Sequence, residues 1–139
     1  MLRGLTTVNL YADDLAAAQS WYTQFLGTEP YFLREVDGKP AYIEFRIGDY
    51  QHELGVIDRR FAAPGPMPNT MTYWHVDDVT ATYKSLLDLG ATSYEGPREH
   101  SPGFVTASVI DPFGNVLGVM FNQHYVDILA QRTPLNSKG

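Results

Sequence analysis

The chain reads NLYADDLAAAQSWYTQFLG at residues 9–27 and YWHVDDVTATYKSLLDLG at residues 73–90, so one pattern occurs twice. Each copy begins with a strand-like stretch, passes through an Asp-Asp pair, and continues with apolar residues at helical spacing up to a glycine. This order predicts a strand, a helix capped by aspartate, and a left-handed residue that ends the helix. Further along, Leu54-Gly55-Val56 is matched 63 residues later by Leu117-Gly118-Val119. The sequence therefore predicts two copies of one module.

The chain has the length of one domain and divides into two halves. Its 139 residues can bury roughly 68–70% of the surface that the unfolded chain exposes. We predict a single domain with the modules at about 5–61 and 70–122. Between them, residues 62–69 contain three prolines and a glycine and form a linker. Residues 123–139 form a C-terminal tail, in which a short helical turn is predicted at 124–132.

Each half is predicted to contain one strand, one helix and three further strands. Strand patterns occur at 5–11, 31–36, 41–47 and 51–57, and again at 70–76, 93–95, 104–110 and 116–122. Asp13 or Asp14 caps the first helix, and residues 78–89 form the second. Asp111-Pro-Phe-Gly114 has the residues that a type I turn prefers, which predicts a tight hairpin between the last two strands. The polar, glycine- and proline-containing segment 95–103 is predicted to form a lid.

The composition excludes several classes of protein. Cysteine is absent, which excludes disulfides, thiolate zinc sites and a cysteine nucleophile. Ten basic against sixteen acidic side chains give a net charge of −6, whereas a nucleic-acid-binding surface needs a basic stripe. No apolar run approaches the roughly 20 residues that span a bilayer, and the first residues lack the apolar core of a signal peptide. We therefore expect a soluble, cytoplasmic protein without nucleic-acid or membrane partners.

Two motifs add a family resemblance to the repeated βαβββ pattern. They are Leu10-Tyr-Ala-Asp-Asp-Leu15 near the start and Asp111-Pro-Phe-Gly-Asn115 near the end. Together they resemble the vicinal oxygen chelate superfamily, which includes glyoxalase I, extradiol dioxygenases, fosfomycin-resistance enzymes and bleomycin-resistance proteins. The resemblance covers about residues 5–122. It implies an α+β fold in which two paired βαβββ modules form a cupped mixed sheet around a central cavity, with the helices outside. It also implies a homodimer, but it does not fix the reaction, because the superfamily hosts several chemistries.

The resemblance implies a divalent metal in the cavity, yet this chain has other residues at the ligand positions. The family's first-strand histidine falls on Thr7 in the first half and on Met71 in the second. Its last-strand glutamate falls on Gly55 and Gly118. The four histidines also show no His-x-His or His-x-x-x-His spacing. We therefore predict no cofactor and no metal at the family's usual site.

Strand alternation predicts which side chains line the cavity, because successive residues point to opposite faces of a sheet. The inward set combines aromatic rings with a few polar groups, which suits an organic ligand of modest size. The predicted ligand-binding residues are Asn9, Tyr11, Tyr42, Glu44, Arg46, Tyr73, Phe104 and Ser108. The remaining inward residues are Thr7, Glu53, Met71, His75, Thr106 and Met120.

Several of these residues have a structural alternative. Tyr11 and Tyr73 occupy equivalent places in the two halves, where they either contact a ligand or fill the interior. Glu44 and Arg46 lie on one strand face, and an ion pair with each other or with groups across the sheet is the simpler role.

Two functions are compatible with these residues. The favoured one is a protein of the bleomycin-resistance type that lacks the usual metal ligands and binds a small organic molecule between the modules. The alternative is an enzyme of the glyoxalase or dioxygenase type, hence a lyase, isomerase or dioxygenase, with a displaced metal site or a metal-independent acid/base reaction. In that enzyme, Glu53 and His75 are the catalytic candidates. The simpler role of His75 is a hydrogen bond near the start of the following helix.

Overall fold

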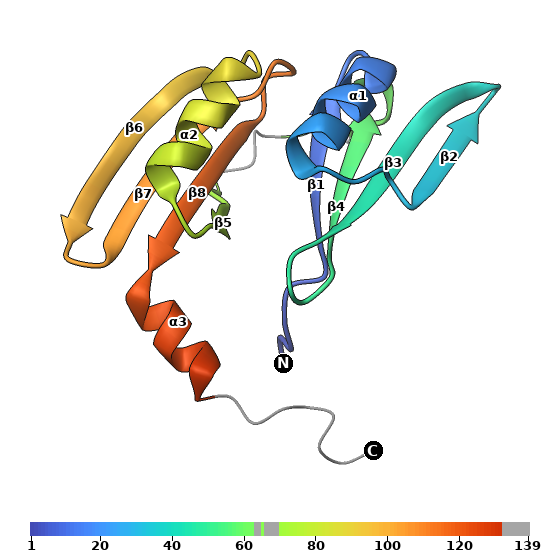
Figure 1. Cartoon of the computed structure of the whole chain (residues 1–139). Helices are drawn as coiled ribbons and strands as arrows, with labels where there is room; N and C mark the ends of the chain where they lie inside the picture. Colours follow the sequence, from blue (N-terminus) through green and yellow to red (C-terminus); the bar gives the residue numbers. More distant parts are fainter. Residues whose placement is uncertain (63–64, 66–69, 132–139) are drawn as a thin grey trace. The chain divides into compact units, whose positions relative to one another are not determined.

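The structure, a computed structural model, describes residues 1–62, 65 and 70–131, and its elements follow the order βαβββ twice (Figure 1). The first module contains β1 (Thr7–Ala12), α1 (Leu15–Leu26), β2 (Phe32–Val36), β3 (Lys39–Ile47), β4 (His52–Asp58) and the short 3-10 helix η1 (Arg59–Phe61). The second contains β5 (Tyr73–His75), α2 (Val79–Asp88), β6 (Thr92–Ser101), β7 (Phe104–Ile110), β8 (Val116–Asn122) and the added helix α3 (Gln123–Ala130). The predicted α+β fold with two βαβββ modules is confirmed.

The chain divides into two compact units. Unit 1 comprises Met1–Asn69 and Asp111–Asn115, and unit 2 comprises Thr70–Ile110 and Val116–Gly139. The turn that joins β7 to β8 along the chain is thus part of unit 1.

Each unit has a four-stranded mixed sheet, and the two sheets have the same topology. Sheet 1 has the strand order β1-β4-β3-β2, and sheet 2 has the order β5-β8-β7-β6. The first and last strands of each module pair in parallel, and the other pairs are antiparallel. The repeat in the sequence therefore corresponds to a repeat of the sheet.

The second aspartate of each Asp-Asp pair starts the helix that follows. Asp14 and Asp78 each accept a hydrogen bond at 3.0 Å from the backbone N–H three residues later, as expected of an N-cap. The first helix ends at Gly27, whose φ of 71° lies in the left-handed region. The second ends at Leu89, and Gly90 follows with a φ of 101°. The caps and the glycine stops agree with the prediction from the sequence.

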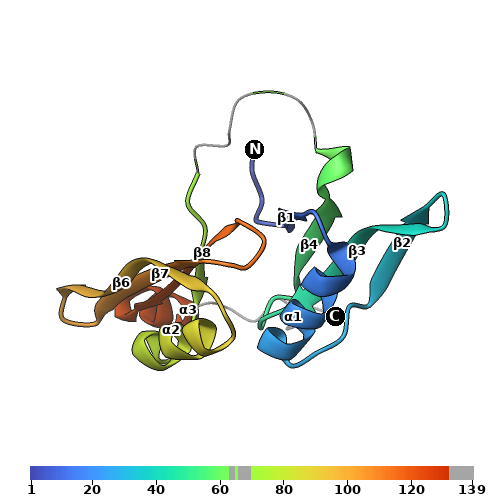
Figure 2. The same cartoon turned by 90° about the horizontal axis from the view of Figure 1, so that it is seen from above.

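One face of each sheet is covered by the helix of its own module (Figure 2). Helix α1 packs on β3 and β4, and α2 packs mainly on β7. In unit 1 the buried apolar residues include Leu15, Ala18, Tyr22, Ala41, Ile43, Phe45, Leu54 and Val56. In unit 2 they include Val79, Leu86, Ala107, Val109, Leu117 and Val119. Along β3 the buried residues alternate with exposed or half-buried ones, so Tyr42, Glu44 and Arg46 lie on the opposite face.

The predicted lid at 95–103 is wrong. Most of this segment belongs to β6, which pairs antiparallel with β7 from Thr92 to Ser101. The pairing shifts register at three places, one of which spans Gly96 and Pro97. Because β6 is an edge strand of sheet 2, a proline without an N–H group is tolerated there.

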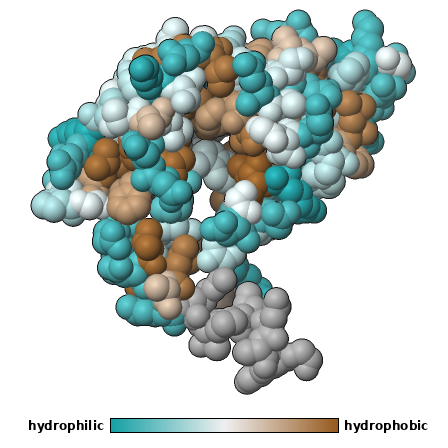
Figure 3. All heavy atoms as spheres, viewed as in Figure 1, coloured by the Kyte–Doolittle hydropathy of each residue, from teal (hydrophilic) through white to brown (hydrophobic). Residues whose placement is uncertain are grey.

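The remaining boundaries differ by a few residues from the prediction. The strand predicted at 70–76 is confined to Tyr73–His75, so Met71 precedes it. The helical turn predicted in the tail is present as α3, which buries no residue and has hydrophobic side chains at its surface (Figure 3). Most of the predicted linker at 62–69 lies outside the described residues, as does the end of the tail from 132. Within the described ranges, no helix is long and apolar enough to cross a membrane.

Asp111 organises the turn between β7 and β8. One of its carboxylate oxygens accepts hydrogen bonds from the backbone N–H groups of Phe113 at 2.9 Å and Asn115 at 2.8 Å. The other accepts from the Asn115 side chain at 2.9 Å and from the Tyr22 hydroxyl. Burial, together with the adjacent Asp111 carboxylate, raises the pKa of Tyr22 well above its ordinary value. Gly114 donates to the Asp111 carbonyl at 3.2 Å, which confirms the predicted tight turn.

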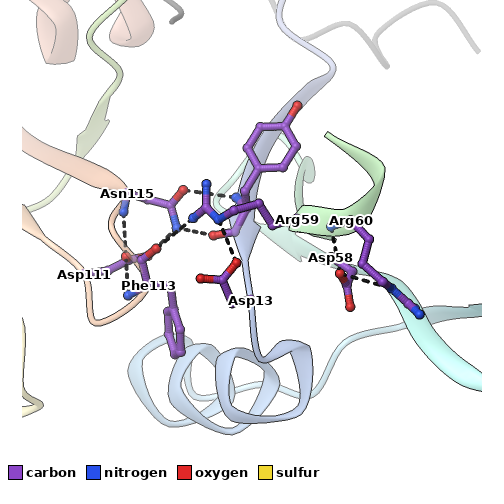
Figure 4. A network of polar contacts seen from close by, with 8 residues as sticks. Asp13, Asp58, Arg59, Arg60, Asp111, Phe113 and Asn115 are labelled. Carbon is purple, nitrogen blue, oxygen red and sulfur yellow. Dashed lines mark hydrogen bonds and ion pairs between the residues drawn. The ribbon is translucent and has the colours of Figure 1, made fainter. Parts of the chain in front are cut away.

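Asn115 pairs with the free edge of sheet 1. Its side-chain amide accepts from the Tyr11 N–H at 3.0 Å and donates to the Tyr11 carbonyl at 2.8 Å, in the place of a neighbouring strand. Arg59 lies beside this pair, 3.0 Å from Asp13, and also donates to the Phe113 carbonyl at 3.0 Å (Figure 4). The Asp-Pro-Phe-Gly-Asn motif therefore stabilises unit 1.

Candidate functional site

The face of sheet 1 opposite α1, here called the open face, carries most of the candidate residues of the first module. The pairing of β1, β2, β3 and β4 fixes its members, because residues opposite one another share a face. They are Thr7, Asn9, Tyr11, Phe32, Arg34, Tyr42, Glu44, Arg46, Glu53, Gly55 and Ile57. All seven residues of the first module that the sequence placed in the cavity lining therefore share this face.

Glu53 has partners for both of its carboxylate oxygens. The Thr7 hydroxyl donates to one oxygen at 2.6 Å, and the Arg46 guanidinium lies 3.1 Å from the other. The ion pair of Arg46 is thus formed across the sheet, with Glu53 and not with Glu44. These two contacts fix the position of the Glu53 carboxylate on the open face.

The Arg46 side chain is held by two further contacts. Its guanidinium lies over the Tyr31 ring, 4.7 Å from the ring centroid. A second terminal nitrogen donates to the Gln51 carbonyl at 3.2 Å. The positive charge of Arg46 is therefore already engaged by groups of the same unit.

Tyr42 and Glu44 form a second hydrogen-bonded pair on the open face. The Tyr42 hydroxyl donates to a Glu44 carboxylate oxygen. Burial raises the pKa of both groups, and the negative charge of Glu53 raises each further. The positive charge of Arg46 lowers the pKa of Glu44, but by less. Glu44 consequently takes up a proton more readily than an ordinary glutamate.

Gly55, at a metal-ligand position of the resembled family, lies beneath two side chains. A Cβ at this position would be 2.4 Å from the Asn9 amide oxygen and 2.5 Å from the Tyr42 hydroxyl. Real Cβ atoms essentially never come this close to another heavy atom. The space that a ligating side chain would need is thus filled by Asn9 and Tyr42.

Gly118, the equivalent residue in the second module, is covered in the same way. A Cβ there would be 2.5 Å from the Thr72 carbonyl oxygen and 2.7 Å from the Tyr73 ring. Because one of these atoms belongs to the backbone, a side chain could not be accommodated by a rotamer change alone. Thr7 and Met71, at the two histidine positions, are not ordinary metal ligands. The residues present therefore do not fit the family's usual metal centre.

Sheet 2 has a corresponding face opposite α2. The pairing of β5, β7 and β8 places on it Tyr73, His75, Phe104, Thr106, Ser108 and Met120. Thr106 and Ser108 are buried, whereas Tyr73 exposes 37% of its surface. The alternation predicted for these strands is thus present in unit 2 as well.

His75 lies among aromatic rings. Its ring centroid is 5.9 Å from that of Phe121 and 5.2 Å from that of Tyr125 in α3. Glu53, the other catalytic candidate, belongs to unit 1, whereas His75 belongs to unit 2. Their joint role in proton transfer stays a prediction.

His100 is a residue of this face that the sequence did not indicate. Its Nε2 lies 2.8 Å from the Thr106 hydroxyl, and its ring centroid is 4.8 Å from that of Phe104. The polar composition of 95–103 indicated a loop and not a strand. In the structure, β6 extends to Ser101 and brings His100 against β7. Within the part of the chain that the structure describes, no three His, Asp or Glu side chains are grouped so that they could hold a metal ion.

Comparison with protein families gives a match over most of the chain. The sequence profile of the Glyoxalase/Bleomycin resistance protein/Dioxygenase superfamily matches residues 4–119. No protein with a curated description matches the chain.

Solved structures of low sequence identity share the fold. A member of this superfamily from Sphaerobacter thermophilus is 19% identical with a TM-score of 0.68, over 86% of this chain and 97% of that one. A glyoxalase-related enzyme from Fulvimarina pelagi is 20% identical with a TM-score of 0.67, over 88% and 90% of the two chains. Lactoylglutathione lyase from Agrobacterium tumefaciens is 21% identical with a TM-score of 0.64, over 90% and 98%. At these identities the likeness concerns the fold.

Proposed function

This chain belongs to the Glyoxalase/Bleomycin resistance protein/Dioxygenase superfamily, and from that premise we propose that it binds a small organic molecule on the open face of sheet 1. Binding takes place without a divalent metal at the positions that the superfamily uses for its ligands.

The observation that carries this proposal is the packing over Gly55. Asn9 and Tyr42 occupy the space beside Gly55, where the family resemblance implies a metal-ligating side chain, so an amide and a phenol stand there instead. An amide and a phenol in that place bind organic groups by hydrogen bonds and ring contacts.

The composition of the open face supports an organic ligand. Tyr31 and Phe32 expose 50% and 47% of their surfaces, and they adjoin the polar cluster formed by Tyr42, Glu44 and Arg46. Apolar rings with a few placed polar groups are typical of small-molecule sites.

We favour binding over an acid/base reaction that uses Glu53. Both oxygens of its carboxylate have partners, from Thr7 and Arg46, so this side chain already has a structural role in sheet 1.

The proposal is tested by screening small aromatic and polar compounds against isotope-labelled protein in buffer that contains a metal chelator. We expect compounds that shift the backbone amide resonances of β3 and β4, and we expect Phe32→Ser to weaken their binding. The matched control is Tyr94→Ser, which removes an aromatic side chain of 62% exposure from unit 2. Binding that requires added metal, or that is weakened equally by both substitutions, contradicts the proposal.

A further inference from the structure

Among the described residues, Glu44 is the carboxylate of the open face that forms no ion pair. Arg46 pairs with Glu53 at 3.1 Å and donates elsewhere to a backbone carbonyl. Arg34 shares the face, but among the described residues it forms no ion pair with Glu44. In the same part of the chain, the one hydrogen bond of the Glu44 side chain is accepted from Tyr42.

The groups that face Glu44 include no ion-pair partner for it among the described residues. They are Tyr42 and Arg46 from β3, Glu53 from β4, Arg34 from β2, and the uncharged Thr7 and Asn9 from β1. Burial raises the pKa of Glu44, the charge of Glu53 adds to this, and Arg46 opposes it in part. The balance favours one more positive charge beside Glu44, which is supplied either by a proton or by a cation.

An exposed aromatic ring lies next to this carboxylate. Phe32 stands opposite Glu44 in the β2–β3 pairing, and its ring centroid is 6.2 Å from that of Tyr42. Arg46 covers the Tyr31 ring, whereas no cation lies over Phe32 among the described residues. An exposed ring without a cation, next to a carboxylate without an ion pair, suits a molecule with an apolar body and a positively charged group.

We propose that the ligand of the open face is an organic cation, such as an arylalkyl amine, whose charged group pairs with Glu44 and whose apolar part packs on Phe32. This inference rests on the proposed function and names the class of ligand. Arg46 is paired with Glu53, and Arg34 forms no ion pair with Glu44 among the described residues, so Glu44 is the carboxylate that is available to the charged group of the ligand. At acidic pH the incoming cation displaces the proton that Glu44 carries, and that proton passes to the solvent.

Three probes with the same ring and different charge test the proposal: phenethylamine, 2-phenylethanol and 3-phenylpropionate. Each is titrated at neutral pH into wild type, Glu44→Gln and the control Glu29→Gln, with open-face amide resonances as the readout. Glutamine keeps an acceptor for Tyr42, and Glu29→Gln removes an exposed carboxylate outside the open face. We expect the amine to bind wild type and control at least about tenfold more tightly than the alcohol, and Glu44→Gln to reduce this preference to about twofold or less.

The outcomes separate this inference from the proposed function. An undiminished amine preference in Glu44→Gln, or tighter binding of the alcohol or carboxylate to wild type, overturns the inference. If the alcohol shifts open-face amides and the amine has no advantage, the inference fails and the proposed function stands. If none of the three probes shifts these amides at about 10 mM, the inference fails, and the broader compound screen in chelator decides the proposed function.

Proton release gives an independent readout. Calorimetric titration of phenethylamine in buffers of different ionisation enthalpy measures the protons released on binding. We expect wild type to release protons just above pH 4.5, the ordinary pKa of a glutamate, because Glu44 is still partly protonated there. Glu44→Gln is expected to release none. Equal release by the two proteins, or none from wild type over the acidic range, overturns the proposal.

Discussion

The Tyr42 side chain lies over Gly55. A Cβ at position 55 would be 2.5 Å from the Tyr42 hydroxyl and 2.7 Å from its Cε1 atom. The bare backbone of Gly55 is therefore what allows the Tyr42 ring to rest on β4 while its hydroxyl reaches Glu44. One glycine, at a position where the family resemblance implies a metal ligand, thus positions an aromatic residue of the open face.

Gly55→Ala is expected to lower the free energy of unfolding by about 1–3 kcal/mol, because the added methyl group forces Asn9 and Tyr42 to move. The measurement is urea denaturation. Gly96→Ala is the matched control, since a Cβ there has only an ordinary contact of 3.8 Å, and we expect it to stay within about 0.5 kcal/mol of wild type. Equal stability of the two variants would show that the packing over Gly55 is loose.

Tyr22→Phe is expected to cost about 1–3 kcal/mol of unfolding free energy at neutral pH, because it removes one of the donors to the buried Asp111 carboxylate. Denaturant unfolding measures this cost. A change below about 0.5 kcal/mol would mean that Asp111 does not depend on the Tyr22 hydroxyl.

The raised pKa of Tyr22 also predicts a pH dependence. The unfolded chain loses the Tyr22 hydroxyl proton near pH 10, whereas the folded chain loses it at a higher pH. The contribution of this proton to the stability of the fold is therefore complete below pH 10 and is lost as the pH rises through the folded pKa. Stability measured at alkaline pH should therefore fall less steeply in Tyr22→Phe than in wild type. Parallel curves would contradict the assignment.

Glu44→Gln is expected to be at least as stable as wild type at neutral pH. The pKa of Glu44 is raised in the folded protein. The contribution of Glu44 to the free energy of unfolding is therefore fully present below pH 4.5 and is lost as the pH rises through the folded pKa. Glutamine has no charge to bury, and unfolding curves of the two proteins should diverge in favour of the variant as the pH increases above 4.5. Divergence in favour of wild type would show that Glu44 is compensated by a cation in the free protein.

Asn115→Ala is expected to expose the edge of β1. The variant removes the side-chain oxygen that accepts the 3.0 Å hydrogen bond of the Tyr11 N–H. Loss of about 1 kcal/mol of protection at this amide corresponds to an increase of roughly fivefold in the hydrogen-exchange rate of Tyr11. The core amides of β4 serve as the internal control. An unchanged exchange rate at Tyr11 would mean that another group protects this edge.

Much of the fold follows from local patterns in the sequence. Asp14 and Asp78 could be identified as caps because capping depends on residues three positions apart. The segment 95–103 could not be identified as a strand, because glycine and proline normally interrupt one. Its strand character depends on the register shifts that an edge strand tolerates, and these are properties of the pairing with β7.

The candidate site was predictable only as a set of residues on one face. Alternation placed Tyr42, Glu44 and Arg46 together, but the choice of Glu53 as the partner of Arg46 depends on the β3–β4 register. The role of Asp111 was equally hidden, because its partner Tyr22 lies 89 residues away along the chain. Contacts of this range are not contained in a local pattern.

Elemental analysis of the protein purified without chelator or affinity metal tests the central claim most directly. We predict far less than one divalent ion per chain, and no uptake after incubation with zinc, nickel, manganese or iron, because Asn9 and Tyr42 fill the ligand position at Gly55. About one tightly bound divalent ion per chain would contradict the proposal that the open face binds its ligand without a metal.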